Sequence, residues 1–471
     1  MRFDTLTGTL ALAALSRSVA ADPLTITLQN RRRVPAGLKP KTNVMKRSSA
    51  STVSLTNWFE NYDLQWYGTV QVGTPPQNFT VTFDTGSTDL VLPSSSCTTC
   101  TQESVFTRAS SDTFSPLPGY NVTTSFGTGG KSIPYAEPQP ASGTVVTDAV
   151  ALAGHTVPNQ TFLLCDTYAD AFNEMPIDGI FGMGPPGFSH FSEVVTNASF
   201  STWFWTLAAQ GEVPEPRFSI FLNSDVNGTS APLGEITLGG VNAARYTGDI
   251  KYIDFNMTVS AAGMGWFIDQ PSFFVDGKTV TNSSANGAAF PGGVSLVDTG
   301  TAFLQAPDYQ TAKDIYAAIS PEITQIDPLG AWGAPCGVVE KLDPELTFTL
   351  GFGAQAVNVT VPRGEFNLGE YPGQNGTCQT LLLNPVTPIS DSVPIWVLGG
   401  PLLKGYYTVW DGAQPEALKF GVAELRANAT TGGNGTGTSP SATPTAVSGG
   451  NLVGPVGWMA AAGVAAAALA L

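Results

Sequence analysis

The sequence predicts an all-β protein built as two related lobes. Of its 471 residues, 42% are hydrophobic and only 12% are charged, while glycine (51) and proline (35) are abundant. Short runs rich in valine, threonine and phenylalanine between turn-forming residues favour β-strands over helices. The chain also repeats itself, because residues 81–93 recur as residues 295–307 with the pattern Asp-Thr-Gly-[Ser/Thr]-x-x-Leu-x-x-Pro.

A second short motif supports this duplication. Residues 180–182 (Ile-Phe-Gly) follow the first copy, and residues 397–399 (Val-Leu-Gly) follow the second at a nearly equal distance. The chain is long enough for two lobes, so we expect each lobe to supply one aspartate, Asp84 or Asp298. The expected bounds are 48–235 for the N-terminal β lobe and 236–425 for the C-terminal β lobe.

The N-terminal segment predicts secretion and processing. Residues 1–21 combine an apolar run with small residues suited to cleavage, which is typical of a signal peptide; a buried strand is the alternative. Residues 22–47 are basic and end in Lys46-Arg47, which predicts the propeptide of a zymogen with a dibasic processing site. Lys39 or Lys41 could lie across an acidic cleft as a latch, and a solvated linker is the alternative.

The C-terminal segment predicts attachment to a membrane. Residues 426–450 are rich in Gly, Ser, Thr and Pro, as in a flexible linker. Residues 451–471 are almost wholly apolar and hold no basic residue. This pattern favours a removable glycosylphosphatidylinositol (GPI) signal over a spanning helix, which usually has basic cytoplasmic flanks. A tail-inserted helix stays the alternative.

Sequons and cysteines agree with the secretory route and an oxidising compartment. Cys336 and Cys378 are expected to form a disulfide. Cys97 and Cys100 can close a small loop, although a Cys-x-x-Cys pair also suits redox or zinc chemistry. No second Cys pair or His cluster supports a metal site. Cys165 is left over as a buried thiol, and its pairing with Cys97 or Cys100 stays open. Eleven sequons are candidate glycosylation sites: Asn78, Asn121, Asn159, Asn197, Asn227, Asn256, Asn282, Asn358, Asn375, Asn428 and Asn434.

The net charge of −16 argues against nucleic acid as a partner, because an acidic body repels phosphates. Seven of the 21 basic residues lie within 31–47, so processing would leave a still more acidic body. Such a body suits low pH, where protonated carboxylates no longer repel one another; acidity for solubility alone is the alternative.

Local patterns predict a lid and two packing helices. A strand at 121–128 enters a Gly-rich turn and returns at 144–152, so this hairpin, with an enlarged tip at 131–142, is a candidate lid. An ordinary surface hairpin is the alternative. Apolar residues at helical spacing predict helices at 193–210 and 308–319, the second with Pro307 at its first helical position. Further strands are expected at 67–73, 79–83, 218–222, 234–240 and 249–255.

Because the sequence lacks the motifs of other common catalytic sites, a pair of carboxylates is the expected catalytic group. The chain has two histidines and no Gly-x-Ser-x-Gly elbow, phosphate-binding loop or dinucleotide fingerprint. Two carboxylates in hydrogen-bonding range share a proton, so one acts as a base for water while the other donates to a carbonyl oxygen. That chemistry needs no metal or cofactor. A glycosidase with two carboxylates is an alternative, but it predicts no duplication around the acids.

Five motifs in order, over about residues 58–425, resemble the pepsin-like aspartic endopeptidases. They are Tyr-Gly-Thr-Val-x-Val-Gly-Thr-Pro-Pro from residue 67, both Asp-Thr-Gly motifs, Asp-Gly-Ile-Phe-Gly from residue 178 and Val-Leu-Gly from residue 397. The resemblance implies a bilobal pepsin-like acid protease fold with the active-site cleft between the two lobes. It implies a monomer that cuts proteins or peptides at acidic pH with a water held between Asp84 and Asp298. With its tail, the chain is similar to secreted, surface-attached fungal proteases.

The same resemblance assigns roles to the neighbours of the two aspartates. Thr85 and Thr299 would link the two active-site loops. Ser87 and Thr301 would donate hydrogen bonds to the outer carboxylate oxygens. Gly86 and Gly300 would allow the two loops to approach each other closely. The lid would carry Phe126, Gly127 and Thr128.

Two positions depart from the family pattern. Phe126 stands where the lid tyrosine is usual, and Val91 stands where a tryptophan is usual. Tyr135 in the tip is a candidate substitute. Because the lid departs in this way, a pepsin-like binding or cell-wall protein without catalysis is the alternative function.

Overall fold

The computed structural model describes residues 24–32, 63–127, 139–173, 177–187, 189, 191, 202–222, 234–263, 265–282, 288–289, 293–386, 388–390, 393–414 and 417–426. The predicted signal, Lys39, Lys41, the tail, Thr128 and Tyr135 lie outside these residues. So do the sequons Asn197, Asn227, Asn428 and Asn434.

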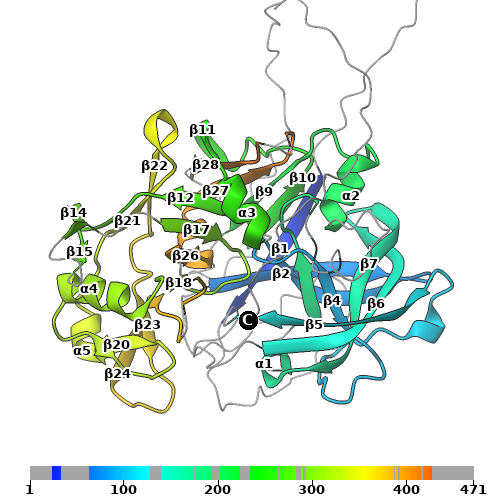
Figure 1. The fold of residues 1–471 in the computed structure, drawn as a ribbon, viewed down its shortest axis with the longest axis horizontal. Coiled ribbons are helices and arrows are strands. Elements are labelled where there is room, and N and C mark those ends of the chain that lie inside the picture. Colours follow the sequence, from blue (N-terminus) through cyan, green and yellow to red (C-terminus); the bar gives the residue numbers. More distant parts are fainter. Residues whose placement is uncertain are drawn as a thin grey trace, which may run out of the picture. The chain divides into compact units, whose positions relative to one another are not determined.

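Most described elements are β-strands, which confirms the predicted all-β class. Thirteen strands form one sheet (Figure 1). Its order is β11 (Tyr246–Asp254), β28 (Lys419–Leu425), β27 (Tyr406–Asp411), β9 (Arg217–Leu222), β10 (Gly234–Leu238), β1 (Leu24–Arg32), β2 (Asp63–Val72), β3 (Gln77–Asp84), β8 (Gly179–Gly182), β4 (Leu90–Pro93), β7 (His155–Tyr168), β6 (Gln139–Leu152) and β5 (Ser115–Phe126).

Smaller sheets build the rest of the second lobe. A five-stranded sheet has the order β12 (Phe267–Gln270), β17 (Gly293–Val297), β26 (Ile395–Leu398), β18 (Leu304–Gln305) and β25 (Leu382–Leu383). Two four-stranded sheets are β14 (Lys278–Thr279), β13 (Ser272–Val275), β21 (Leu346–Leu350), β22 (Val357–Thr360), and β19 (Thr324–Gln325), β20 (Trp332–Pro335), β24 (Thr377–Thr380), β23 (Asn367–Glu370). Strands β15 (Thr281–Asn282) and β16 (Ala288–Ala289) form a separate pair.

The two copies of the repeat fold in the same way. In the first lobe, β3 runs parallel to β8, and β4 runs antiparallel to β8. In the second lobe, β17 runs parallel to β26, and β18 runs antiparallel to β26. The orders β2-β3-β8-β4-β7 and β12-β17-β26-β18-β25 therefore match. The strands β3, β8, β17 and β26 are mostly buried, which explains why they read as apolar runs in the sequence.

Strand β1 lies within the predicted propeptide and was not foreseen. It pairs antiparallel with β10 through Leu24–Leu28 and with β2 through Gln29–Arg32. A solvated linker is therefore wrong for these nine residues. The signal that could have found the strand is the apolar–polar alternation of residues 24–28, which the basic residues nearby obscured.

The helices that the structure describes are short. Helix α4 (Tyr309–Ile319) confirms the predicted helix at 308–319, but Asp308 is its N-cap and accepts from the Thr311 N–H at 2.8 Å. Pro307 precedes this cap, so placing it at the first helical position was wrong. Helix α2 (Trp203–Ala209) confirms only the later part of the helix predicted at 193–210. A continuous helix from 193 was wrong, because Thr202 is the N-cap of α2 and has a non-helical backbone. The other helices are α1 (Asp170–Asn173), α3 (Met257–Gly263), α5 (Cys336–Val339) and α6 (Gly400–Leu403), with 3₁₀ turns at Arg108–Ser110 and Gly353–Gln355. Within the described ranges, no helix is long and apolar enough to cross a bilayer.

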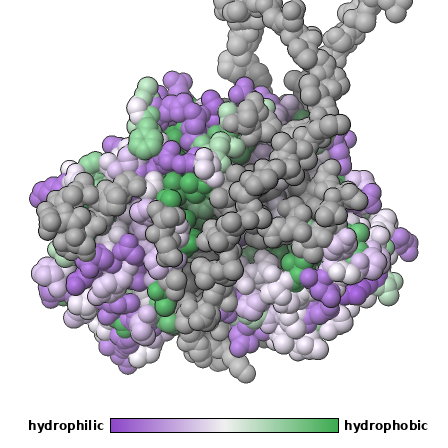
Figure 2. Space-filling model, viewed as in Figure 1, coloured by the Kyte–Doolittle hydropathy of each residue, from purple (hydrophilic) through white to green (hydrophobic). Residues whose placement is uncertain are grey.

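An aromatic cluster joins the two lobes in the core. Phe218 on β9 stacks on Trp410 of β27 at 5.3 Å between ring centroids. Trp205 of α2 lies 6.1 Å from Trp266, which directly precedes β12. Burying each such ring stabilises the fold by about 2–3 kcal/mol. By contrast, hydrophilic residues cover most of the coloured surface in Figure 2.

Candidate active site

Each aspartate stands at the end of a buried strand. Asp84 is the last residue of β3, and Asp298 directly follows β17. The Met183 N–H donates to the Asp84 carbonyl at 2.7 Å, and the Asp298 N–H donates to the Leu398 carbonyl at 3.1 Å. The neighbouring strand of each lobe therefore fixes the backbone of its aspartate. Both residues are nearly buried, with 7% and 8% of their surfaces exposed.

The same two kinds of donor hold each carboxylate. The bonds run from the Gly86 N–H to Asp84 Oδ1 (2.8 Å), from Ser87 Oγ to Asp84 Oδ2 (2.5 Å), from the Gly300 N–H to Asp298 Oδ1 (2.7 Å) and from Thr301 Oγ1 to Asp298 Oδ2 (2.5 Å). Because both oxygens of each group are engaged, the carboxylates cannot rotate freely. Such bonds also favour the ionised form of a carboxyl group.

The two glycines show that the carboxylates face each other. A Cβ placed on Gly86 would lie 2.5 Å from Cγ of Asp298. A Cβ placed on Gly300 would collide with the carboxylate of Asp84. The glycine of each lobe therefore contacts the acid of the opposite lobe, and a larger residue would push the pair apart.

Two threonines link the loops beneath the carboxylates. The bonds are Thr85 N–H to Thr299 Oγ1 (3.0 Å), Thr299 N–H to Thr85 Oγ1 (3.0 Å), Thr85 Oγ1 to the Val297 carbonyl (2.8 Å) and Thr299 Oγ1 to the Phe83 carbonyl (2.7 Å). Every bond crosses between the lobes and has a counterpart in the other direction. This reciprocal set fixes the distance between the two strand ends.

Burial, as the largest cause, raises the pKa of Asp84 well above its ordinary value. The negative charge of Asp298 and a hydrogen bond with it raise this pKa further, whereas the Ser87 hydroxyl and the Gly86 N–H lower it. Two carboxylates that face each other in a buried site cannot both ionise easily. The arrangement therefore suits a pair that shares one proton.

The downstream glycines allow each active-site loop to pass over a neighbouring strand. A Cβ on Gly182 would overlap the backbone of Thr88 and Asp89. A Cβ on Gly399 would overlap the carbonyl oxygens of Thr301 and Phe303. The motifs at 180–182 and 397–399 are thus structural supports of the two loops.

The predicted hairpin is present and is longer than expected. Strands β5 and β6 pair antiparallel from Ser115–Thr147 to Phe126–Gln139. The ring of Phe126 meets the ring of Phe172 edge to face, with centroids 5.4 Å apart. Val91 is buried in the apolar cluster against which Phe126 packs. Apolar contacts therefore stand where the family has a polar pair, and Gly127 is exposed at the end of the described strand.

The cysteines pair as expected. Cys336 bonds Cys378, Cys97 bonds Cys100, and Cys165 is a buried free thiol on β7. The alternative pairing of Cys165 with Cys97 or Cys100 is therefore not formed. Burial, as the main cause, raises the pKa of the Cys165 thiol, which makes the thiol unreactive.

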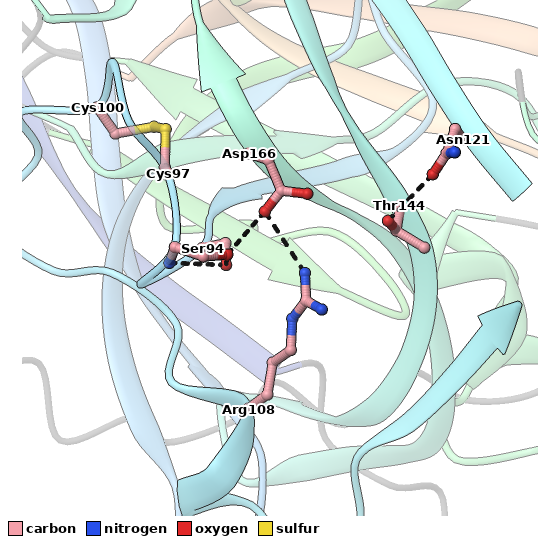
Figure 3. A network of polar contacts seen from close by, with 8 residues as sticks. Ser94, Cys97, Cys100, Arg108, Asn121, Thr144 and Asp166 are labelled. Atoms are coloured by element: carbon pink, nitrogen blue, oxygen red, sulfur yellow. Dashed lines mark hydrogen bonds and ion pairs between the residues drawn. A yellow bond between two sulfur atoms is a disulfide. The ribbon is translucent and has the colours of Figure 1, made fainter.

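The sequons differ in accessibility. The exposed ones are Asn78, Asn121, Asn159, Asn358 and Asn375. On β5, Asn121 Oδ1 accepts from Thr144 Oγ1 at 3.3 Å (Figure 3). Asn256 is half-buried; its amide donates to Asp269 at 2.8 Å and accepts from the Val259 N–H at 3.1 Å. Because both ends of the Asn256 side chain are in use, this sequon is less suited to a glycan than the exposed ones.

Two tryptophans support the site but were not singled out from the sequence. The Trp205 indole N–H donates to the Gly184 carbonyl at 2.7 Å, and the Trp266 indole N–H donates to the Met183 carbonyl at 2.9 Å. Both acceptors follow the 180–182 motif directly. No local pattern points to these contacts, because Trp266 is 83 residues away from Met183 in the chain.

Comparison with known proteins shows which family this chain resembles in sequence. The family described as "Eukaryotic aspartyl protease" matches residues 65–424. "Major aspartyl peptidase 1" of Cryptococcus neoformans var. grubii is 28% identical over 409 residues, which are 84% of this chain and 76% of that protein. "Mucorpepsin" of Rhizomucor miehei is 28% identical over 389 residues (80% and 82%). "Gastricsin" of Macaca fuscata fuscata is 30% identical over 352 residues (74% and 81%).

Facing aspartates on duplicated strand ends, in a two-lobed β fold, define the class of aspartic-type peptidases. The family match spans most of the described residues and includes both aspartates. The chain belongs to the eukaryotic aspartyl protease family, and it is an aspartic-type endopeptidase that hydrolyses peptide bonds.

Proposed function

We propose that the protein cleaves internal peptide bonds of proteins at acidic pH with a water molecule held between Asp84 and Asp298. The observation that carries the proposal is the contact of Gly86 and Gly300 with the opposite carboxylates, which sets the two acids face to face. The hydrogen bonds from Ser87 and Thr301 to the outer oxygens leave the inner sides of the pair for water.

In the proposed reaction, the ionised carboxylate removes a proton from water while the protonated one donates its proton to the peptide carbonyl oxygen. Water attacks the carbonyl carbon and a tetrahedral diol forms. The C–N bond then breaks as the protonated aspartate gives its proton to the amine nitrogen. The other aspartate removes a proton from a diol hydroxyl, so the carbonyl group of the new carboxylic acid forms. The pair ends the cycle with one shared proton, and no other reactant is consumed.

The pH range follows from that proton count. When both acids are protonated no base remains, and when both are ionised no donor remains. Burial and the facing charge raise the pKa of Asp84, so the shared proton stays on the pair at mildly acidic pH. The net charge of −16 favours the same range, because self-repulsion of the body falls as carboxylates become protonated.

We further propose that the protein is made as a zymogen and acts at the cell surface as a monomer. A signal at 1–21, a propeptide at 22–47, a linker at 426–450 and a GPI signal at 451–471 would flank lobes that meet near residue 235. The dibasic Lys46-Arg47, the eleven sequons and the apolar tail support this course.

The decisive test is the processed protein assayed on a denatured protein substrate at pH about 3–5. Asp84→Asn and Asp298→Asn should each lower kcat by about 10⁴-fold or more, because each removes a reacting group. Asp249→Asn, an exposed acid on β11, is the matched control and should retain activity. Activity that survives either active-site change would reject the mechanism. A peptide analogue with a central hydroxyl in place of the cleaved bond should inhibit.

The anchor needs a separate test on cells that display the protein. A phosphatidylinositol-specific phospholipase should release it into the medium if the tail at 451–471 was exchanged for GPI. Protein that stays on the membrane after this treatment would favour a tail-inserted helix instead.

A further inference from the structure

A small disulfide loop lies against the last strand before α1. Cys97 and Cys100 close the loop, and Figure 3 shows it beside Asp166 of β7. Ser96 Oγ donates to Asp166 Oδ1 at 2.8 Å, and the Thr98 N–H donates to the Asp166 carbonyl at 3.2 Å. Arg108 reaches the same carboxylate at 3.5 Å. The loop is thus fastened to β7 at several points.

The same loop also fixes α1, which follows β7. Thr99 Oγ1 accepts from the Tyr168 N–H and donates to the Tyr168 carbonyl, both at 2.8 Å. Asn173 Nδ2 donates to the Thr99 carbonyl at 2.8 Å, and the Thr101 N–H donates to Asn173 Oδ1 at 3.0 Å. Gln102 adds a bond to the carbonyl oxygen of Phe172 at 3.1 Å. Because α1 has only four residues, it depends on such tertiary bonds for its placement.

From α1 the contacts continue to the lid through aromatic rings. Phe172 packs on Tyr168 with centroids 4.6 Å apart, and Phe126 meets Phe172 at 5.4 Å. The Tyr168 hydroxyl reaches the carbonyl oxygen of Asp178 at 3.4 Å, and Cys100 packs against the same apolar cluster. Phe126 is the last residue of β5. The ring of Phe172 therefore supports the hairpin at the turn end of its paired strands, where Phe126 pairs with Gln139.

We propose that the Cys97–Cys100 loop positions the lid, because it holds Phe172 in place through Thr99 and Asn173, and Phe126 rests on Phe172. Thr99, Asn173 and Phe172 are positioning residues that do not touch the reacting atoms. The inference deepens the proposed function and rests on it only in its kinetic consequence, since lid support matters for catalysis only if substrate is cleaved.

Hydrogen–deuterium exchange tests the inference without any enzymatic activity. In the double variant Cys97→Ser/Cys100→Ser, and in Thr99→Val and Asn173→Ala, amides in 115–126 and 139–146 should exchange at least about fivefold faster, as expected when roughly 1 kcal/mol of support is lost. Thr98→Val is the matched control, because Thr98 contacts Asp166 through its backbone. If all three variants fold and the lid amides exchange as in the wild type, the inference is wrong.

Kinetics give the second arm of the test. Thr99→Val and Asn173→Ala should raise KM for a long peptide about fivefold while kcat stays within twofold, because a lid holds substrate and does not supply a reacting group. Phe172→Ala should behave likewise, whereas Phe172→Tyr, which keeps the ring, should restore KM. Equal losses in kcat for all variants would overturn the positioning role. Faster lid exchange in a protein without peptidase activity would keep the inference and reject the proposed function.

Discussion

The two lobes are nearly identical around the two aspartates and differ in the β5–β6 hairpin and in their disulfides. Around Asp84 and Asp298, the donors to both carboxylate oxygens correspond one to one. The β5–β6 hairpin, which we propose as the lid, belongs by contrast to the first lobe. The lobes are therefore symmetric where their two carboxylates must face each other. They differ at the hairpin, which one lobe can provide by itself.

The disulfides show the same contrast. The first lobe closes a loop with a sequence separation of 3, and the second lobe closes one with a separation of 42. The short one fastens a few residues beneath the lid, whereas the long one joins α5 to β24. We infer that the second lobe uses its disulfide for global stability and the first lobe uses its own for local placement.

Removing each disulfide in turn should distinguish global stabilisation from local placement, and we expect this to be the largest effect. Cys336→Ser/Cys378→Ser should lower the free energy of unfolding by about 4 kcal/mol, and Cys97→Ser/Cys100→Ser by only about 1.6 kcal/mol, because the loop entropy released grows with loop length. Urea unfolding measures both values. Equal losses would break the comparison. Hydrogen–deuterium exchange of the hairpin amides should become faster only when the Cys97–Cys100 disulfide is removed.

The glycines at the close approach should be equally intolerant in the two lobes. Gly86→Ala and Gly300→Ala should each lower kcat/KM by about 10²-fold, because the added Cβ displaces the opposite carboxylate by a fraction of an ångström or more. Gly337→Ala is the control, since a Cβ there meets open space. Steady-state kinetics decide this, and a tenfold difference between the two variants would contradict the symmetry.

The threonine pair should show matched losses of stability. Thr85→Val and Thr299→Val should each cost about 2 kcal/mol, because each leaves the buried N–H of the other threonine without its acceptor. The double variant should cost less than the sum of the single costs, since both changes break one network. Thr349→Val, a half-exposed threonine on β21, serves as the control and should change stability by less than about 0.5 kcal/mol.

Asp84→Asn should stabilise the fold at neutral pH, because the amide does not carry the buried negative charge whose desolvation raises the pKa of Asp84. The folded protein raises the pKa of Asp84, so the folded state binds this proton more tightly than the unfolded chain. The associated stability is complete below the ordinary pKa of 3.8 and is lost as pH rises through the folded value. Melting temperatures at pH 3 and pH 7 should differ by less in the variant than in the wild type. A variant that is less stable at pH 7 would contradict this account.

The sequence predicts the parts of this protein that repeat or alternate. The doubled Asp-Thr-Gly motif predicted two matched strand ends, and apolar patterns predicted α4 and the hairpin. The contact of Phe126 with Phe172 was not predictable, because it depends on how β5, α1 and the small disulfide loop pack together. The indole bonds of Trp205 and Trp266 were missed for the same reason. Strand β1 was missed because the basic residues near it suggested a solvated segment, although residues 24–28 alternate between apolar and polar.

Strand β1 also has a mechanical consequence. In the large sheet it stands between β10 and β2, with five strands on the side of β10 and seven on the side of β2. A cut at Lys46-Arg47 would sever its covalent link to the body but leave both rows of hydrogen bonds in place. The segment would then hold β10 and β2 together through noncovalent contacts alone. If β1 dissociated, the edges of β10 and β2 would lose their hydrogen-bond partner. Another extended segment could then pair with them in place of these nine residues.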